Sequence, residues 1–228
     1  MTRFSDRLSP LSLGEKVRAL FVLACLALTS ACGVVGPSQP VPEEHYYRLE
    51  LPAPKAGASG LKGVVVVDAL EAAAIYARRA IVYSEDPQHL TLQEYHYHFW
   101  TDPPPRLLQQ ALVSHLRQAQ PAATVADEAG RALWDYRVSG RVLRFERLRA
   151  GPGWQTAVDI ELRVDAAGER RPLLVKNYTR NQAVGGESME ATVQAFARAV
   201  AEIFADFLND LRAAPPAAPP TATTTPGP

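Results

Sequence analysis

The sequence predicts an α+β fold in which two long amphipathic helices pack on one face of a largely antiparallel sheet. The first observation is the alternation of apolar and polar residues between Trp154 and Val164, which is typical of a strand with one buried face. The second is an apolar stripe between Met189 and Leu211, with spacings of three and four, which is typical of an amphipathic helix. Because a half-covered sheet needs helices to bury its apolar side, we assign both patterns to one domain.

The predicted domain spans residues 46–211, about 165 residues, which is the size of one ordinary domain. An unbroken run of valines within residues 61–70 predicts a strand that is buried on both faces. The four strands predicted in this half are 46–51, 61–70, 79–84 and 90–100.

The fourth of these strands alternates sharply, so we expect an aromatic core face and an opposite face that water can reach. The predicted core face holds Tyr95, Tyr97 and Phe99, and the opposite face holds His96, His98 and Trp100.

Asp102 and the prolines after it predict the start of a helix that runs to about Ala119 and stops before Pro121. The residues expected to point inward from this helix are Leu108, Ala111, Leu112 and either His115 or Leu116.

Three strands follow as a predicted meander. In the first, from Trp134, the apolar residues change phase after Val142, which predicts a β-bulge near Gly140. The second covers residues 154–164, and a turn at 165–168 leads to the third, at 173–181. Ser188 is a suitable N-cap for the closing helix. Its phenylalanine stripe allows two interpretations, a core face against the sheet or a surface for a membrane or a partner.

The N-terminal segment, residues 1–31, has the pattern of a signal peptide, with basic residues followed by an uncharged run that ends at Cys32. This run is shorter than the roughly 20 residues that a membrane-spanning helix needs. Small residues before Cys32 resemble the lipobox of bacterial lipoproteins, so we expect lipidation and cleavage at Cys32. Two alternatives remain open. Cys25 fits the local pattern but lies close to Arg18, and a plain secretory signal would leave Cys32 as a free thiol.

Two segments without apolar periodicity flank the domain. Residues 32–45 are rich in proline and predict a tether, whose dozen residues after Cys32 would span roughly 35–40 Å if extended. Residues 212–228 consist almost entirely of proline, alanine and threonine, so we expect this tail to be disordered.

Composition and motifs narrow the function. The chain holds 24 basic and 24 acidic residues, so it lacks the basic excess of a nucleic-acid-binding protein. It contains no Gly-x-Ser-x-Gly, no His-Glu-x-x-His and no phosphate-binding loop, and we therefore expect no enzymatic activity and no cofactor. His96 and His98, with His89 nearby, could present imidazoles to zinc, although histidines of a solvated strand face explain them better. Trp100 is either an anchor in a partner groove or a core residue that holds the strand to the next helix.

The order of these features resembles the ABC-type transport auxiliary lipoprotein family. The features are the lipidated cysteine, the start Tyr46-Tyr47-x-Leu49, the valine strand, and the aromatic strand that runs into Trp100 and prolines before a helix; Tyr76, Arg78, Ile81, Val82 and Tyr83 also fit. The resemblance implies a lipoprotein anchored on the periplasmic face of the outer membrane. It also implies a partner, a periplasm-spanning substrate-binding protein of the mammalian-cell-entry type, which several copies arranged in a ring could hold. The alternative is a scaffold for envelope assembly, and an anchored hydrolase fits least.

Overall fold

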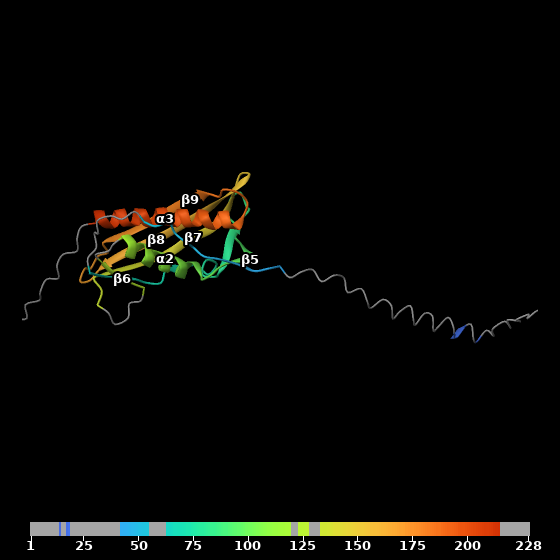
Figure 1. Cartoon of the computed structure of the whole chain (residues 1–228), viewed down its shortest axis with the longest axis horizontal. Coiled ribbons are helices and arrows are strands. Elements are labelled where there is room, and N and C mark those ends of the chain that lie inside the picture. Colours follow the sequence, from blue (N-terminus) through green and yellow to red (C-terminus); the bar gives the residue numbers. More distant parts are fainter. Residues whose placement is uncertain are drawn as a thin grey trace, which may run out of the picture. The chain divides into compact units, whose positions relative to one another are not determined.

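The computed structural model describes residues 14, 17–18, 42–54, 63–119, 123–127 and 133–214. The chain divides into two units, Met1–Pro42 and Glu43–Pro228, and the second holds the whole sheet. In its described residues this unit is an α+β domain, with a nine-stranded mixed sheet and two helices on one face of the sheet (Figure 1). The predicted signal peptide and Cys32 lie outside the described residues, apart from residues 14 and 17–18, as do most of the tether and tail.

The predicted meander forms the body of the sheet. Strands β7 (Tyr136–Ala150), β8 (Gly153–Ala166) and β9 (Leu174–Ala183) pair antiparallel in sequence order. The register of β7 against β8 shifts between Val142 and Arg144, so the bulge lies slightly beyond the position predicted from Gly140. Gly140 has a different role. A Cβ there would lie 2.3 Å from the backbone oxygen of Glu161, so only glycine permits this close approach of the two strands.

Short strands attach to the other edge of β7. Strands β2, β3 and β4 each pair with β7 in parallel, and β5 pairs antiparallel with β4. Strand β1 then pairs with β5 and strand β6 with β2, both in parallel. The sheet is therefore antiparallel in its long pairings and parallel in most of its short ones. The bounds are β1 His45–Tyr47, β2 Gly63–Val67, β3 Glu71–Ala72, β4 Ala80–Ser84, β5 Gln93–Trp100 and β6 Ala123–Ala126.

The faces predicted for the aromatic strand are right only in part. Tyr95 packs against the core and His96 is exposed, as predicted. Trp100 is only 1% exposed and belongs to the core, whereas Tyr97, which was expected inside, is 42% exposed. The cause is an irregularity in the pairing of β4 with β5, where Ala80 faces Phe99 but Val82 faces Glu94. Such a shift breaks the two-residue alternation on which the prediction depended.

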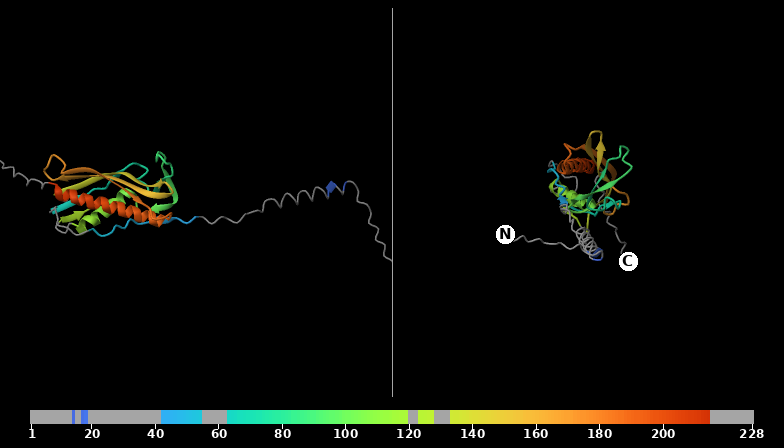
Figure 2. Two further views of the ribbon diagram at one scale, coloured as in Figure 1. Left: turned by 90° about the horizontal axis from the view of Figure 1, so that it is seen from above. Right: turned by 90° about the vertical axis from the view of Figure 1, so that its right-hand side faces the viewer.

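Two helices cover one face of the sheet (Figure 2). Helix α3 (Met189–Ala213) begins at Ser188, whose side chain accepts a hydrogen bond from the amide of Ala191, as predicted. Helix α2 (Pro104–Ala119) begins differently from the prediction. The carbonyl of Pro103 accepts bonds from the first-turn amides, and the carboxylate of Asp102 instead lies 3.8 Å from the guanidinium of Arg106.

The core lies between the sheet and these helices. Phe196, Phe204 and Phe207 of α3 are fully buried, so the phenylalanine stripe is a core face and not a membrane or partner surface. These rings pack against aromatic rings of the sheet, because the ring centroids of Phe196 and of Phe145 on β7 lie 4.4 Å apart. Helix α2 adds the leucines expected to point inward, and both His115 and Leu116 are buried.

Candidate functional site

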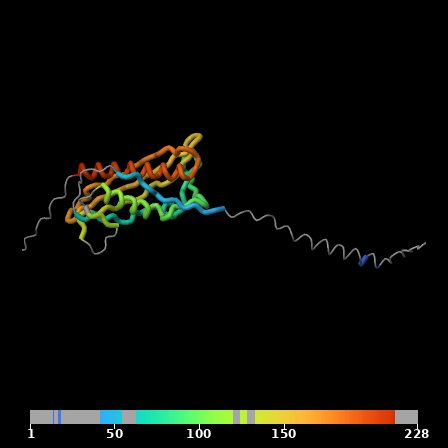
Figure 3. The backbone as a smooth tube through the Cα atoms, in the orientation of Figure 1, coloured from blue at the N-terminus to red at the C-terminus, as the bar shows by residue number. Residues whose placement is uncertain are grey.

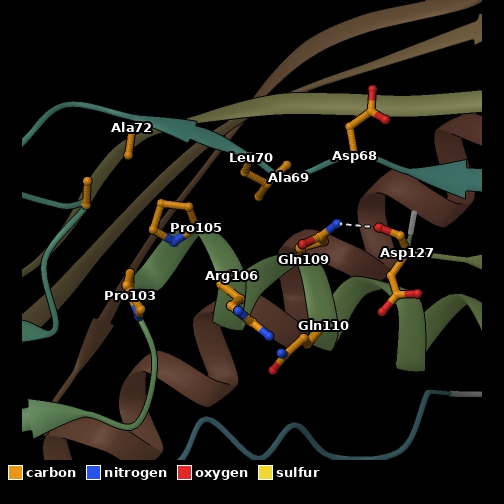
Figure 4. Close-up of a pocket in the computed structure, with 11 residues that line it drawn as sticks. Asp68, Ala69, Leu70, Ala72, Pro103, Pro105, Arg106, Gln109, Gln110 and Asp127 are labelled. Atoms are coloured by element: carbon orange, nitrogen blue, oxygen red, sulfur yellow. Dashed lines mark hydrogen bonds between the residues drawn. The ribbon is translucent and has the colours of Figure 1, made fainter. Parts of the chain in front are cut away.

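A cavity of about 780 Å³ opens beside the N-terminal half of α2 (Figure 4). One wall comes from the loop that joins β2 to β3, and the other from the first two turns of α2 and from Pro103 before it. The lining residues are Asp68, Ala69, Leu70, Ala72, Ala77, Pro103, Pro105, Arg106, Gln109, Gln110 and Asp127.

Gln109 ties the walls of this cavity together. Its side-chain amide donates a hydrogen bond to the carbonyl of Val67, 2.9 Å away. It donates another to the carbonyl of Asp127, 2.8 Å away, and Figure 4 shows this second bond. Val67 ends β2 and Asp127 follows β6, so one side chain joins the carboxyl ends of two parallel strands. In open α/β sheets, crevices at the carboxyl ends of parallel strands are common ligand sites.

Two of the three charged residues that line the cavity, Asp68 and Arg106, form ion pairs with residues outside the lining. The Asp68 carboxylate lies 3.0 Å from the guanidinium of Arg137 on β7, and Arg106 lies near Asp102. The lining contains no serine, cysteine, histidine or lysine, so it presents no nucleophile with an adjacent base. Its lining is a mixture of polar side chains and apolar ones.

Trp100, for which the sequence allowed a partner contact or a core position, lies in the core. Its ring packs 5.4 Å from Phe145 and 5.4 Å from Phe196, with almost none of its surface exposed. This burial agrees with the core interpretation. It removes Trp100 from the residues that can contact a partner directly.

The three histidines considered as zinc ligands have different surroundings. His98 is half-buried, its Nδ1 lies 3.0 Å from the hydroxyl of Tyr47, and burial is the main cause that lowers its pKa. His96 is exposed, and His89 lies in a loop with a left-handed backbone, φ 56°. Within the part of the chain that the structure describes, no three His, Cys, Asp or Glu side chains gather in a way that could hold a metal ion.

Sequence reasoning missed the residues of the cavity. Asp68 directly follows the valine strand, and a polar residue at the end of a buried parallel strand is a recognisable signal. Gln109 and Asp127 had no such signal, because β6 was not predicted and the partners of Gln109 are backbone carbonyls.

Cys32 lies outside the described residues, and none of the helices in the described ranges is long and apolar enough to span a bilayer.

The sheet and the two helices of the described residues define an α+β domain. The model of the family described as ABC-type transport auxiliary lipoprotein component matches residues 47–207, and the chain belongs to this family. The resemblance noted from the sequence is thereby confirmed.

Solved structures show the same fold. A protein from Xanthomonas campestris is 19% identical with a TM-score of 0.64, over 72% of this chain and 92% of that one. A second, uncharacterized protein is 16% identical with a TM-score of 0.62, over 75% of this chain and 99% of that one. No curated protein matches this chain.

Proposed function

We propose that this protein is a non-enzymatic, lipid-anchored auxiliary component of an ABC-type lipid or organic-solvent transport system. In this role it binds the periplasmic substrate-binding protein of the mammalian-cell-entry type at the outer membrane. The observation that carries the proposal is the family match, which covers nearly the whole domain. Two features of the domain agree with it: the cavity beside α2 lacks a nucleophile with its base, and the near-neutral chain has no basic excess.

The anchor in this proposal is Cys32. Two or more acyl chains hold a protein stably at a membrane, whereas one chain does so only marginally, and lipoprotein processing supplies that number on a single cysteine. Gly33 rather than Asp follows Cys32, which by resemblance to other lipoproteins favours sorting to the outer membrane.

A labelled fatty-acid analogue tests the anchor. Wild type should incorporate the label and fractionate with the outer membrane, and Cys32→Ser should do neither. Cys25→Ser is the matched control and should behave as wild type. Label in Cys32→Ser, or a wild-type protein found wholly in the soluble fraction, would contradict this part of the proposal.

Co-purification tests the partner. The full chain should isolate the substrate-binding protein of the transport system and not its ATPase, and deletion of the gene should sensitise cells to detergents and solvents. A protein that fails to bind this partner, in cells whose permeability barrier survives the deletion, would point instead to an envelope scaffold.

A further inference from the structure

Exposed aromatic rings lie together at one pair of strands. Among the tyrosine, phenylalanine and tryptophan side chains that the structure describes, the two most exposed are Tyr46, at 48%, and Tyr97, at 42%. Tyr46 belongs to β1 and Tyr97 to β5, and these strands pair with each other. The Tyr46 ring stacks on Phe99 of β5, with the ring centroids 5.6 Å apart. Phe99 is only two residues beyond Tyr97, so both exposed rings belong to one small surface.

An irregularity of β5 coincides with the exposed position of Tyr97. Ala80 of β4 pairs with Phe99, but two residues further along β4 the partner is Glu94. Residues 95–98 are therefore not paired with β4. Bulges of this kind turn side chains out of the regular alternation, and they are frequent beside functional sites. The strand thus gives up pairing with its neighbour at the place where an aromatic ring is exposed to water.

One basic and one acidic side chain flank the Tyr46 ring. The guanidinium of Arg79 lies over this ring, 5.5 Å from its centroid, and the carboxylate of Glu44 accepts a hydrogen bond from the Tyr46 hydroxyl. No carboxylate of the described residues forms an ion pair with Arg79. We call the surface formed by Glu44, Tyr46, Arg79, Tyr97 and Phe99 the β1–β5 face. It combines amphipathic rings with one positive and one negative charge.

The chain enters the domain at the β1–β5 face. Residues 43–47 and β5 lie at the same end of the domain (Figures 1 and 3). Ten residues separate Cys32 from Glu43. Even a fully extended chain would therefore keep Glu43 within about 40 Å of Cys32. Helix α3 begins at this end and runs about 37 Å away from it. An anchor at Cys32 thus attaches to the end of the domain that carries the exposed rings.

We propose that the β1–β5 face lies in the headgroup region of the bilayer that holds the lipid anchor. Tyrosine rings are enriched at membrane–water interfaces, where the ring contacts apolar groups and the hydroxyl stays hydrated. The guanidinium of Arg79 pairs with a lipid phosphate, and the carboxylate of Glu44 pairs with a lipid ammonium group. The charges therefore match a zwitterionic phospholipid better than an anionic one. This inference rests on the proposed function, because the anchor at Cys32 supplies the attachment.

A bilayer fits this face better than a protein does. A stable protein interface buries about 800 Å² on each partner, far more than two partly exposed rings offer. The acyl chains of an anchor already supply stable attachment, so a small face is sufficient to orient the domain. With the β1–β5 face on the membrane, α3 runs away from the bilayer and the rest of the domain stays accessible to the transport partner.

The test uses the full lipidated chain in nanodiscs of phosphatidylethanolamine and phosphatidylcholine, the latter with or without bromine near the headgroup end of its acyl chains. Bromine quenches tryptophan on contact. Tyr97→Trp adds a tryptophan to the face, and its emission above that of wild type should fall by about half or more in brominated nanodiscs. Asn177→Trp is the matched control, because this exposed position of β9 is separated from β5 by three strands. Its added emission should be unchanged.

A charge reversal tests the role of the headgroup. Arg79→Glu, made in Tyr97→Trp, replaces attraction to the lipid phosphate by repulsion and should restore at least half of the lost emission. Circular dichroism on each variant confirms that it is folded.

Three results would overturn the inference. They are unquenched emission of Tyr97→Trp, equal quenching of Asn177→Trp, and quenching that Arg79→Glu leaves unchanged. If Tyr97→Trp is unquenched while Tyr46→Ser abolishes co-purification of the substrate-binding protein, the face is a protein contact instead. When Cys32 carries lipid, each of these results removes only the inference about the face. If Cys32 carries no lipid, the proposed anchor fails and the inference fails with it.

Discussion

Truncation of Trp100 tests whether the centre of the core is where the structure places it. The Trp100 ring is 1% exposed and contacts the rings of Phe145 and Phe196, so Trp100→Ala removes a large side chain that links β5, β7 and α3. Substitutions of this type cost about 3–5 kcal/mol of unfolding free energy. For a domain of this size, each kcal/mol lowers the melting temperature by about 2–4 °C. The expected decrease is therefore about 6–20 °C.

Urea unfolding followed by far-ultraviolet circular dichroism measures this loss without depending on tryptophan fluorescence. Tyr97→Ala is the control, because Tyr97 lies on the same strand but is 42% exposed, and it should cost less than about 1 kcal/mol. A loss of less than about 1 kcal/mol for Trp100→Ala would refute the core assignment. Partner binding lost at normal stability would restore Trp100 as a contact residue.

Three further predictions concern other parts of the domain. Burial lowers the pKa of His115 below its ordinary 6.5, so the unfolded chain binds more protons than the folded one and stability should fall as the pH drops below about 6.5. His115→Leu should reduce this pH dependence of the unfolding free energy, measured between pH 5 and 7. The same pH dependence in wild type and variant would contradict the prediction. Gln109→Ala should lower the unfolding free energy by about 1–2 kcal/mol, because two backbone carbonyls lose their hydrogen-bond donor. The exposed neighbour Gln110 should tolerate alanine, and equal losses for the two variants in urea unfolding would disprove the role of Gln109. Deletion of Ala213–Pro228 should change the melting temperature by no more than about one or two degrees, since prolines and small residues bury too little to offset chain entropy, and a large drop in a thermal scan would mean that the tail docks.

Local patterns predicted the elements whose neighbours in sequence are also their neighbours in space. The alternation in β8, the stripe of α3 and the cap at Ser188 all depend on residues within one element, and the structure confirms each. The meander β7–β8–β9 follows from short turns, which leave few other pairings for consecutive strands.

Features that depend on distant residues were not predicted. The parallel pairing of β2, β3 and β4 with β7 joins residues about 70 apart, and no local pattern encodes it. The irregular register of β5 is set by β4, so the alternation of its aromatic residues misassigned both Trp100 and Tyr97. The cavity depends on the same long-range contacts, because Gln109 contacts the ends of two strands that local sequence does not bring together.

The central place of β7 has a consequence for the order in which the domain can assemble. Strands β2, β3 and β4 all precede β7 in the chain, yet each needs its edge for sheet pairing. A chain delivered from its N-terminus therefore presents three strands before their common template arrives at residues 136–150. Strand edges that remain unpaired until β7 is present favour aggregation. In contrast, β7, β8, β9 and α3 are consecutive and can pair as soon as they are present, so the last part of the chain to arrive is the part on which the earlier strands must assemble.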